Sequence, residues 1–377
     1  MTQQNPPRSL MFVVNNPAFF LSHRLPIALA AKEQGYAVSV ATMDGDAVQA
    51  IKSHGLTHHV LPMSRSGMNP LAELKTIYAI YQLFRRVRPD IVHLVTIKPV
   101  LYGGIAARLA GVKGVVSAIS GLGFIFTREH KGIDWVRLIT QQLYRVALGH
   151  RNSRVIFQNR NDRDILSRIG AVKSDQVVMI RGSGVDLQQY AAVPEPSPPI
   201  KIIFVARLLR DKGLLEYIEA ADMSRRDGKS YRWVVVGNPD PGNPASVTQD
   251  EARAWGDHVD WLGERSDIAA LYADSHIVVL PSYREGLPKS LVEAAACGRA
   301  VITTDVPGCR DAIEADQTGV LVPVRDARAI YEAVCDLAED TQKRQAMGQA
   351  GRALAQEAFD IRKVVQAHLD IYQALNR

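Results

Sequence analysis

The sequence has 377 residues, 47% of them hydrophobic and 22% charged, and a formal net charge of +6. This is the composition of a soluble globular chain that is long enough for two domains with separate cores. No segment approaches the roughly 18 consecutive apolar residues of a membrane-spanning helix. The N-terminal M-T-Q-Q-N-P-P-R lacks the apolar core of a signal peptide, so we expect a cytoplasmic protein. The three cysteines form no C-x-x-C pair, which argues against a disulfide framework or a cysteine-based zinc site.

Charge is divided unevenly along the chain. Residues 1–190 contain 23 Lys and Arg against 11 Asp and Glu, whereas the remaining residues contain 22 against 28. The basic first half suits an anionic partner. Because it shows no nucleic-acid-binding signature, we expect no nucleic acid there and instead a peripheral contact with anionic membrane, or with a lipid diphosphate in it. The alternative is that the excess arginines serve only solubility.

The first half alternates short apolar runs with helical segments, the pattern of a parallel sheet flanked by helices. The apolar run at residues 10–14 is followed by the loop N-N-P-A-F-F-L-S-H-R. Ligands bind beyond the carboxyl ends of parallel strands, so Asn15, Asn16, His23 and Arg24 are expected beside a cleft. His23 is either an acceptor-site residue or a histidine satisfied at a helix start. The chain has no G-x-G-x-x-G, which argues against a dinucleotide-dependent dehydrogenase.

The next elements carry two further candidates for acceptor contacts. Residues 71–87 read as an amphipathic helix with an apolar face made of Leu74, Ile77, Tyr78, Tyr81 and Phe84. The strand that follows places His93 in its end region, and the loop after it offers Lys98 to an anion.

Two later segments of the first half bear on ligands. Residues 115–119 are an expected strand, and Ser120 and Gly121 follow it, where glycine permits a ligand to approach the backbone closely. Residues 134–148 form a basic amphipathic helix that follows the F-I-F of residues 124–126. Such a helix either packs on the sheet or lies in a membrane interface.

The division into domains is expected near the most proline-rich stretch. A first domain of residues 1–190 is followed by a stiff linker of residues 191–199. A second domain then covers residues 200–358, and a last helix, residues 359–377, returns to the first domain.

The second half contains V-V-L-P-S-Y-R-E-G-L-P-K-S-L-V-E-A-A-A-C-G-R-A-V at residues 278–301. It reads as a buried strand, a polar loop and a helix opened by Pro288. The start of such a helix presents unpaired N–H groups and the positive end of its dipole, which suits a phosphate. Glu285 and Glu293 flank this point and suit sugar hydroxyls. The alternative is that both are solvated surface charges.

Two cations are expected at the same level of the second sheet. Arg207 and Lys212 straddle the loop after the first strand of this domain, in A-R-L-L-R-D-K-G. They supply positive charge for a diphosphate. Two D-x-D triplets, Asp44 to Asp46 and Asp162 to Asp164, lie in the first half, and His54, His58 and His59 lack a neighbouring carboxylate or cysteine, so no metal site is expected.

These motifs resemble those of the retaining glycosyltransferases of family 4. E-G-L-P-K-S-L-V-E is similar to their E-x7-E motif, and A-R-L-L-R-D-K-G to their G-R-L-x-x-x-K-G. The resemblance covers essentially the whole chain and is strongest in residues 200–322. It implies an α/β fold of two doubly wound Rossmann-like domains facing a central cleft, the GT-B type. The first domain would bind the acceptor and the second a nucleotide-sugar donor.

The resemblance implies a role for each motif residue. Glu285 would orient the donor sugar and Glu293 would bind the ribose. Arg207, Lys212 and the helix start at residues 286–288 would stabilise the leaving diphosphate without a metal or another cofactor. The departing phosphate oxygen would take the proton of the acceptor.

The remaining donor contacts are also implied by the resemblance, and they come from Gly286, Leu287, Pro288, Gly263, Glu264, Asn15, Ser120 and Gly121. Two of these positions depart from the family pattern. Asn15-Asn16 replaces a Gly-Gly pair, and Ser120 replaces a histidine that lies beside the donor in the family. A serine donates a hydrogen bond but is no base at neutral pH.

The N-terminal segments resemble those family members that extend undecaprenyl-diphosphate-linked sugars, such as the α-1,3-N-acetylgalactosaminyltransferases of bacterial N-linked glycosylation. This implies transfer of an N-acetylhexosamine from a UDP-sugar to a lipid-diphosphate-linked saccharide at the inner membrane face. The alternatives are a different acceptor, a catalytically inactive sugar-nucleotide-binding subunit, or a sugar phosphorylase, although no lysine has the pyridoxal-phosphate motif of the phosphorylases.

Overall fold

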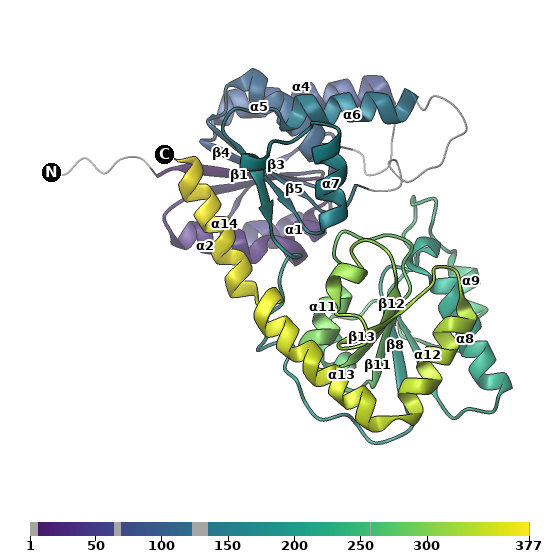
Figure 1. Ribbon diagram of the computed structural model, residues 1–377. Coiled ribbons are helices and arrows are strands. Elements are labelled where there is room, and N and C mark those ends of the chain that lie inside the picture. The colour runs from purple at the N-terminus through teal and green to yellow at the C-terminus, as the bar shows by residue number, and fades with distance from the viewer. Residues whose placement is uncertain (1–6, 64–68, 123–134, 257, 377) are drawn as a thin grey trace. The chain divides into compact units, whose positions relative to one another are not determined.

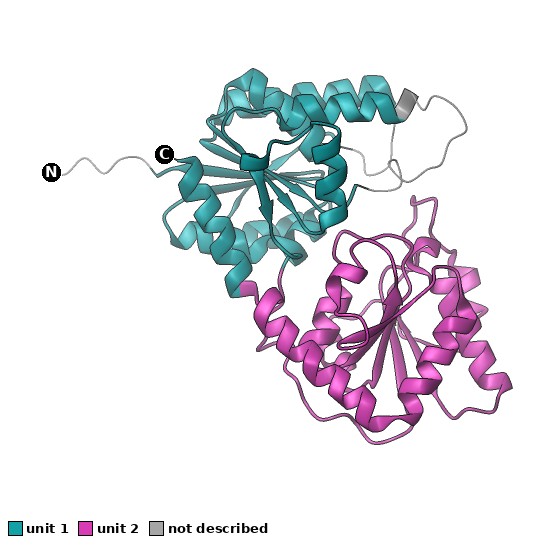
Figure 2. Cartoon of the chain, in the orientation of Figure 1, with its two compact units in different colours: residues 1–183, 362–377 teal, residues 184–361 magenta. Residues whose placement is uncertain are grey.

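The computed structural model describes residues 7–63, 69–122, 135–256 and 258–376. The chain divides into two compact units (Figure 2). Unit 1 comprises residues 1–183 and 362–377, and unit 2 comprises residues 184–361. Each unit is a parallel sheet with helices on both faces, so the doubly wound α/β class predicted from the sequence is confirmed.

The sheet of unit 1 has the strand order β3-β2-β1-β4-β5-β6-β7 within the described residues, and all pairings are parallel. The inner strands are mostly apolar and buried because helices cover both faces of the sheet, whereas the edge strand β3 is T-H-H-V and only partly buried. Their bounds are β1 (Ser9–Val14), β2 (Ala37–Thr42), β3 (Thr57–Val60), β4 (Ile91–Val95), β5 (Gly114–Ile119), β6 (Ser153–Phe157) and β7 (Val177–Met179).

The helices of unit 1 form two layers (Figure 1). One face of the sheet packs against α4 (Pro70–Val87), α5 (Gly104–Ala110), α6 (Trp135–Leu148) and α7 (Arg160–Arg168). The other face packs against α1 (Pro17–His23), α2 (Leu25–Glu33), α3 (Val48–Ser53) and α14 (Ile361–Leu375). A π-helical turn, Pro99–Gly103, leads into α5.

The apolar face expected on α4 is only partly buried. Ile80, Leu83 and Phe84 pack in the core, but Leu74 and Tyr78 are 62% and 61% exposed. Leu74 and Tyr78 lie on the side of α4 opposite to the buried Thr76, Ile80 and Leu83. Apart from Phe84, the apolar face expected from the sequence is therefore not the face that packs in the core.

A polar cluster lies inside unit 1 and joins α14 to the sheet. His93 lies in the middle of β4 and is fully buried, and its Nδ1 is 2.6 Å from the hydroxyl of Tyr372. His368 stacks on His93 with ring centroids 5.5 Å apart, and the buried Arg24 lies close enough to lower the pKa of both histidines. The predicted position of His93 in the end region of the strand is wrong, and its ring contacts α14.

The sheet of unit 2 has the order β10-β9-β8-β11-β12-β13 in the described part of the chain, again with parallel pairings. Its strands are β8 (Lys201–Val205), β9 (Arg232–Val236), β10 (Asp260–Trp261), β11 (Ile277–Leu280), β12 (Ala300–Thr304) and β13 (Gly319–Val322). Its helices are α8 (Leu214–Arg226), α9 (Gln249–Arg253), α10 (Ile268–Ala273), α11 (Lys289–Ala296), α12 (Ala327–Glu339) and α13 (Thr341–Leu354).

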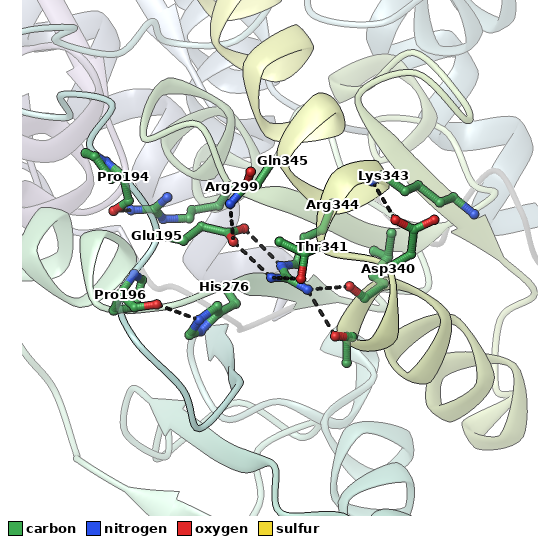
Figure 3. Close-up of polar contacts among 12 residues, drawn as sticks. Pro194, Glu195, Pro196, His276, Arg299, Asp340, Thr341, Lys343, Arg344 and Gln345 are labelled. Carbon is green, nitrogen blue, oxygen red and sulfur yellow. Dashed lines mark hydrogen bonds and ion pairs between the residues drawn. The ribbon is translucent and has the colours of Figure 1, made fainter.

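The proline-rich segment is fixed to unit 2, which corrects its assignment as a linker (Figure 3). Arg344 donates two hydrogen bonds to Glu195, at 3.0 and 2.9 Å, and both side chains are almost fully buried. Arg299 donates to the carbonyls of Val193 and Pro194. Tyr190 packs in the core of unit 2, so the predicted domain boundary at residue 190 lies later than the division after Ser183.

The buried histidines of unit 1 make its stability depend on pH. Burial lowers the pKa of His368 to about 3 and the pKa of His93 well below its ordinary value, so both are neutral in the folded state. The unfolded chain protonates each histidine below about pH 6.5. The free energy of unfolding should therefore fall as the pH falls from 7 to 5. In His368→Leu, this dependence should be shallower by up to about 1.4 kcal/mol per pH unit. Urea unfolding at several pH values measures it, and equal slopes for both proteins would contradict the prediction.

Candidate functional site

The strand order of unit 2 places two loops side by side. The order reverses between β8 and β11, which are hydrogen-bonded neighbours. In open α/β sheets, ligands bind at such a switch point, beyond the carboxyl ends of the strands. The loop after β8 contains Arg207 and Lys212, and the loop after β11 contains Glu285. The N–H of Tyr283 donates to the carbonyl of Asp211 at 2.9 Å and ties the two loops together.

Lys212 and Glu285 form an ion pair across these loops. Their side chains are 19% and 13% exposed. The Lys212 ammonium donates to Oε1 of Glu285, and the hydroxyl of Ser282 donates to the same oxygen at 2.8 Å. The alternative that Glu285 is a solvated loop charge is therefore wrong, because the carboxylate is largely buried and held by two donors.

Arg207 also has a carboxylate partner. Its Nη1 contacts Oδ2 of Asp240, whose side chain is 10% exposed. The loop around Asp240 is ordered by a hydrogen bond that the Asp240 N–H donates to the hydroxyl oxygen of Ser246, at 2.8 Å. The Arg207 side chain stays half exposed, so this contact leaves part of the guanidinium open to a ligand.

A third acid lies between the two cations. Burial raises the pKa of Asp211, which lies next to Lys212 in the chain. The charges of Lys212 and Arg207 lower this pKa, and the charge of Glu285 raises it further. The cations of the site are thus surrounded by carboxylates, which the sequence motif did not predict.

Glu293 lies inside the unit. The residue is 6% exposed, and burial raises the pKa of its carboxyl group. Lys289 Nζ lies 3.2 Å from its Oε1, and the hydroxyl of Tyr190 is a further hydrogen-bond partner. The alternative that Glu293 is a surface helix charge is wrong.

The start of α11 is open to an anion. The helix begins at Lys289 with Pro288 as its N-cap, and no side chain caps it. Gly286, Leu287 and Pro288 are buried beneath this turn. The first N–H groups of an uncapped helix and its dipole attract negative charge.

Two glycines allow the loops to meet. A Cβ on Gly213 would lie 2.0 Å from the carbonyl oxygen of Pro281, and a Cβ on Gly308 would lie 2.4 Å from that of Glu285. Both have positive φ, at +71° and +84°. Because glycine has no Cβ and tolerates positive φ, these two positions allow the neighbouring loops to pack against one another.

Gly263 and Glu264, two of the expected donor contacts, lie at the edge of the same sheet. Gly263 follows β10 and accepts a hydrogen bond from the Gly237 N–H at 2.8 Å. Glu264 beside it is exposed. The indole of Trp261 donates to the Gly237 carbonyl at 2.8 Å, so this edge is held close to the end of β9.

The other predicted contacts belong to unit 1 and are described within it. Asn15 follows β1, and Ser120 and Gly121 follow β5; their contacts with a donor stay predictions. Lys98 forms an ion pair with Glu73 at 2.6 Å. His23 lies at the end of α1, where its ring stacks on Phe19 with centroids 4.0 Å apart. The F-I-F of residues 124–126 lies outside the described residues.

Several residues of the site were not among those predicted from the sequence. Ser282 had a local signal, since it lies three residues before Glu285 in the same loop. Asp240 had none, because it lies 33 residues from Arg207 in the chain. Tyr190 was assigned to the first domain, which hid its contact with Glu293.

The chain matches two protein families. The glycosyl transferase 4-like family matches residues 9–159, and glycosyl transferases group 1 matches residues 188–354. The two matches fall on the two halves of the chain and include the motif residues Arg207, Lys212, Glu285 and Glu293.

Curated relatives and solved structures are similar over most of the chain. The N,N'-diacetylbacillosaminyl-diphospho-undecaprenol alpha-1,3-N-acetylgalactosaminyltransferase of Campylobacter jejuni is 27% identical, over 94% of this chain and 97% of its own. The UDP-Gal:alpha-D-GlcNAc-diphosphoundecaprenol alpha-1,3-galactosyltransferase of Escherichia coli is 26% identical over 80% of each chain. The structure of HepE from Anabaena in complex with UDP-glucose has a TM-score of 0.75 and 20% identity, over 98% of this chain and 99% of its own.

The close approach at Gly308 predicts a difference between two glycine substitutions. Gly308→Ala and Gly228→Ala both place a side chain at positive φ, but a Cβ on Gly228 meets nothing within 4 Å. Gly228→Ala should cost about 1 kcal/mol of stability. Gly308→Ala should cost about 2–4 kcal/mol because Glu285 must also move. Urea unfolding measures both, and equal costs would show that the loops are not in close contact.

Proposed function

Since this chain belongs to the glycosyltransferases that join a glycosyl transferase 4-like domain to a group 1 domain, we propose that it is a retaining, UDP-sugar-dependent enzyme. It transfers a sugar, an N-acetylhexosamine, to an undecaprenyl-diphosphate-linked saccharide. The names of the Campylobacter jejuni and Escherichia coli relatives support this acceptor class. The UDP-glucose bound by HepE supports the donor class.

The observation that carries the proposal is the pairing of Lys212 with Glu285 at the switch point of unit 2. An ammonium has three N–H donors and a guanidinium has five. Lys212 and Arg207 therefore retain donors for phosphate oxygens while each holds its carboxylate. With the uncapped start of α11, they provide positive charge for a diphosphate on one side and a carboxylate for a sugar on the other.

The chemistry follows from this arrangement. The bond between the anomeric carbon and the diphosphate oxygen breaks, and the acceptor oxygen forms the new bond on the same face. The departing phosphate oxygen takes the acceptor proton. Fixed positive groups stabilise the charge that develops on the leaving group, which is the largest catalytic contribution in many enzymes. Glu285 orients the donor sugar, and Glu293 accepts a hydrogen bond from the ribose.

The acceptor and the membrane are proposed to meet unit 1. This unit carries 26 Lys and Arg against 11 Asp and Glu, whereas unit 2 carries 19 against 28. The outer surface of its α4–α6 layer exposes Leu71, Leu74 and Tyr78 on α4, and Leu138, Ile139 and Val146 on α6. Apolar side chains among basic ones suit an anionic interface. None of the helices in the described part of the chain has the length and hydrophobicity to cross a bilayer, so the proposed contact is peripheral, at the inner face of the membrane.

Two alternatives stay open. The enzyme could use a different acceptor, which a panel of lipid-diphosphate and soluble saccharides distinguishes. It could also be a sugar-nucleotide-binding subunit without catalysis, because Ser120 stands where the family has a histidine. The preserved Lys212–Glu285 pair favours an active enzyme.

Replacing Glu285 tests the enzymatic role. Glu285→Gln should reduce transfer by roughly 100-fold or more, because a charged group that contacts the donor sugar is lost. The control is Glu332→Gln, an exposed glutamate on α12. UDP release is measured with and without an undecaprenyl-diphosphate saccharide, and the product anomer is assigned by NMR. Wild-type rates in Glu285→Gln would contradict the role of Glu285, and an inverted product would contradict the retaining mechanism.

The surface of α4 and α6 predicts membrane binding. The wild type should sediment with vesicles that contain phosphatidylglycerol and less with pure phosphatidylcholine. Leu74→Glu with Ile139→Glu should weaken vesicle binding by roughly tenfold or more, since two exposed apolar side chains are replaced by anions. Leu215→Glu, an exposed leucine of unit 2, is the matched control. Equal binding of the double variant and the wild type would exclude this surface.

A further inference from the structure

The two oxygens of the Glu285 carboxylate have different surroundings. Oε1 accepts hydrogen bonds from Lys212 and from Ser282. No hydrogen bond or ion pair to Oε2 is found among the described residues. Both donors thus act on the same oxygen and leave the other one for a ligand.

We propose that Ser282 is a positioning residue of the donor site, which turns the Glu285 carboxylate so that Oε2 accepts a hydrogen bond from a hydroxyl of the donor sugar. This inference rests on the proposed function, since it assigns the sugar side of the same site. Ser282 acts through Glu285 and does not itself touch the substrate.

The backbone of Ser282 is held in place from the neighbouring strand. Ser282 is fully buried, and its carbonyl accepts a hydrogen bond from the hydroxyl of Thr304 in β12. Two residues before Ser282, the carbonyl of Leu280 accepts a hydrogen bond from the hydroxyl of Thr303 at 2.7 Å. A serine hydroxyl has a single donor. Because the backbone is held at both Leu280 and Ser282, the hydroxyl of Ser282 is directed at Glu285.

Ser282 performs a task that Lys212 does not perform alone. The lysine side chain is long and flexible, and its ammonium is attracted to an incoming diphosphate. A carboxylate held only by this lysine would move with it. The neutral hydroxyl of Ser282 is not drawn to phosphate in this way, so Oε1 keeps one partner when the donor binds. The orientation of Oε2 is then independent of where the ammonium moves.

The proposal separates the two parts of the donor. The diphosphate contacts Arg207, Lys212 and the start of α11, none of which needs the Ser282 hydroxyl. The sugar contacts Oε2 of Glu285, and the orientation of this oxygen depends on the Ser282 hydroxyl. Loss of the hydroxyl should therefore weaken the binding of a nucleotide sugar but not the binding of the nucleotide alone. A general loosening of the fold would weaken both.

The test is calorimetric titration of UDP, UDP-N-acetylgalactosamine and UDP-N-acetylglucosamine into the wild type and Ser282→Ala. For the nucleotide sugar that the wild type transfers, the affinity of Ser282→Ala should fall by about tenfold and kcat should fall with it. The affinity for UDP should stay within about twofold. The matched control is Ser275→Ala, which removes an equally buried serine hydroxyl that donates to the Leu271 carbonyl at 2.6 Å. This control should change none of these affinities.

The outcomes are distinguishable. A wild type that binds neither UDP nor a nucleotide sugar overturns the proposed function, and the inference with it. A wild type that binds both, with Ser282→Ala binding both equally well or losing both equally, overturns the inference alone. If Ser282→Ala fails to fold, Ser282→Cys replaces it, because a thiol is similar in shape and a weak donor. The same selective loss is then expected.

Discussion

The ion pair between Lys212 and Glu285 joins two loops that are 73 residues apart in the chain. It forms because β8 and β11 are neighbours in the sheet of unit 2, so that the segments following them leave the sheet at the same edge. Gly213 lets the segment after β8 approach the carbonyl of Pro281 at the end of β11, and Gly308, in the loop after β12, lets that loop approach the carbonyl of Glu285. Arg207, Lys212, the start of α11 and the Glu285 carboxylate all take their places from this junction.

Carboxylates make the site different from a simple positive pocket. Each of the two cations has an acidic partner, and Asp211 adds a third carboxyl group with a raised pKa. Such pairing holds long side chains in one geometry before a ligand arrives, which lowers the conformational cost of binding. Glu293 is held in a comparable way by Lys289 and Tyr190. Tyr190 lies just before the segment that Arg344 and Arg299 fix to unit 2, so the anchoring of this segment also helps to hold Glu293.

The sequence predicted those features that depend on local patterns. Apolar runs predicted the parallel sheets, because strands covered on both faces have no polar alternation. The expected second domain, residues 200–358, contained Arg207, Lys212, Glu285 and Glu293, and all four lie in unit 2. Features that depend on partners far apart in the chain were not predictable. No local pattern indicated that Asp240 pairs with Arg207, or that Arg344 holds the segment predicted to be a linker. Helical periodicity showed that α4 has an apolar face, but not that the opposite side, with Thr76 and Ile80, is the one that packs and leaves Leu74 exposed.

The central claim is that Arg207 and Lys212 act together on the diphosphate of a nucleotide sugar. Titration of UDP and of uridine into the wild type and into Arg207→Ala with Lys212→Ala tests it most directly. The account predicts that the double variant loses UDP affinity by roughly 100-fold or more, as two charge-assisted contacts disappear, while the weak binding of uridine is unchanged. Undiminished binding of UDP to the double variant would contradict it.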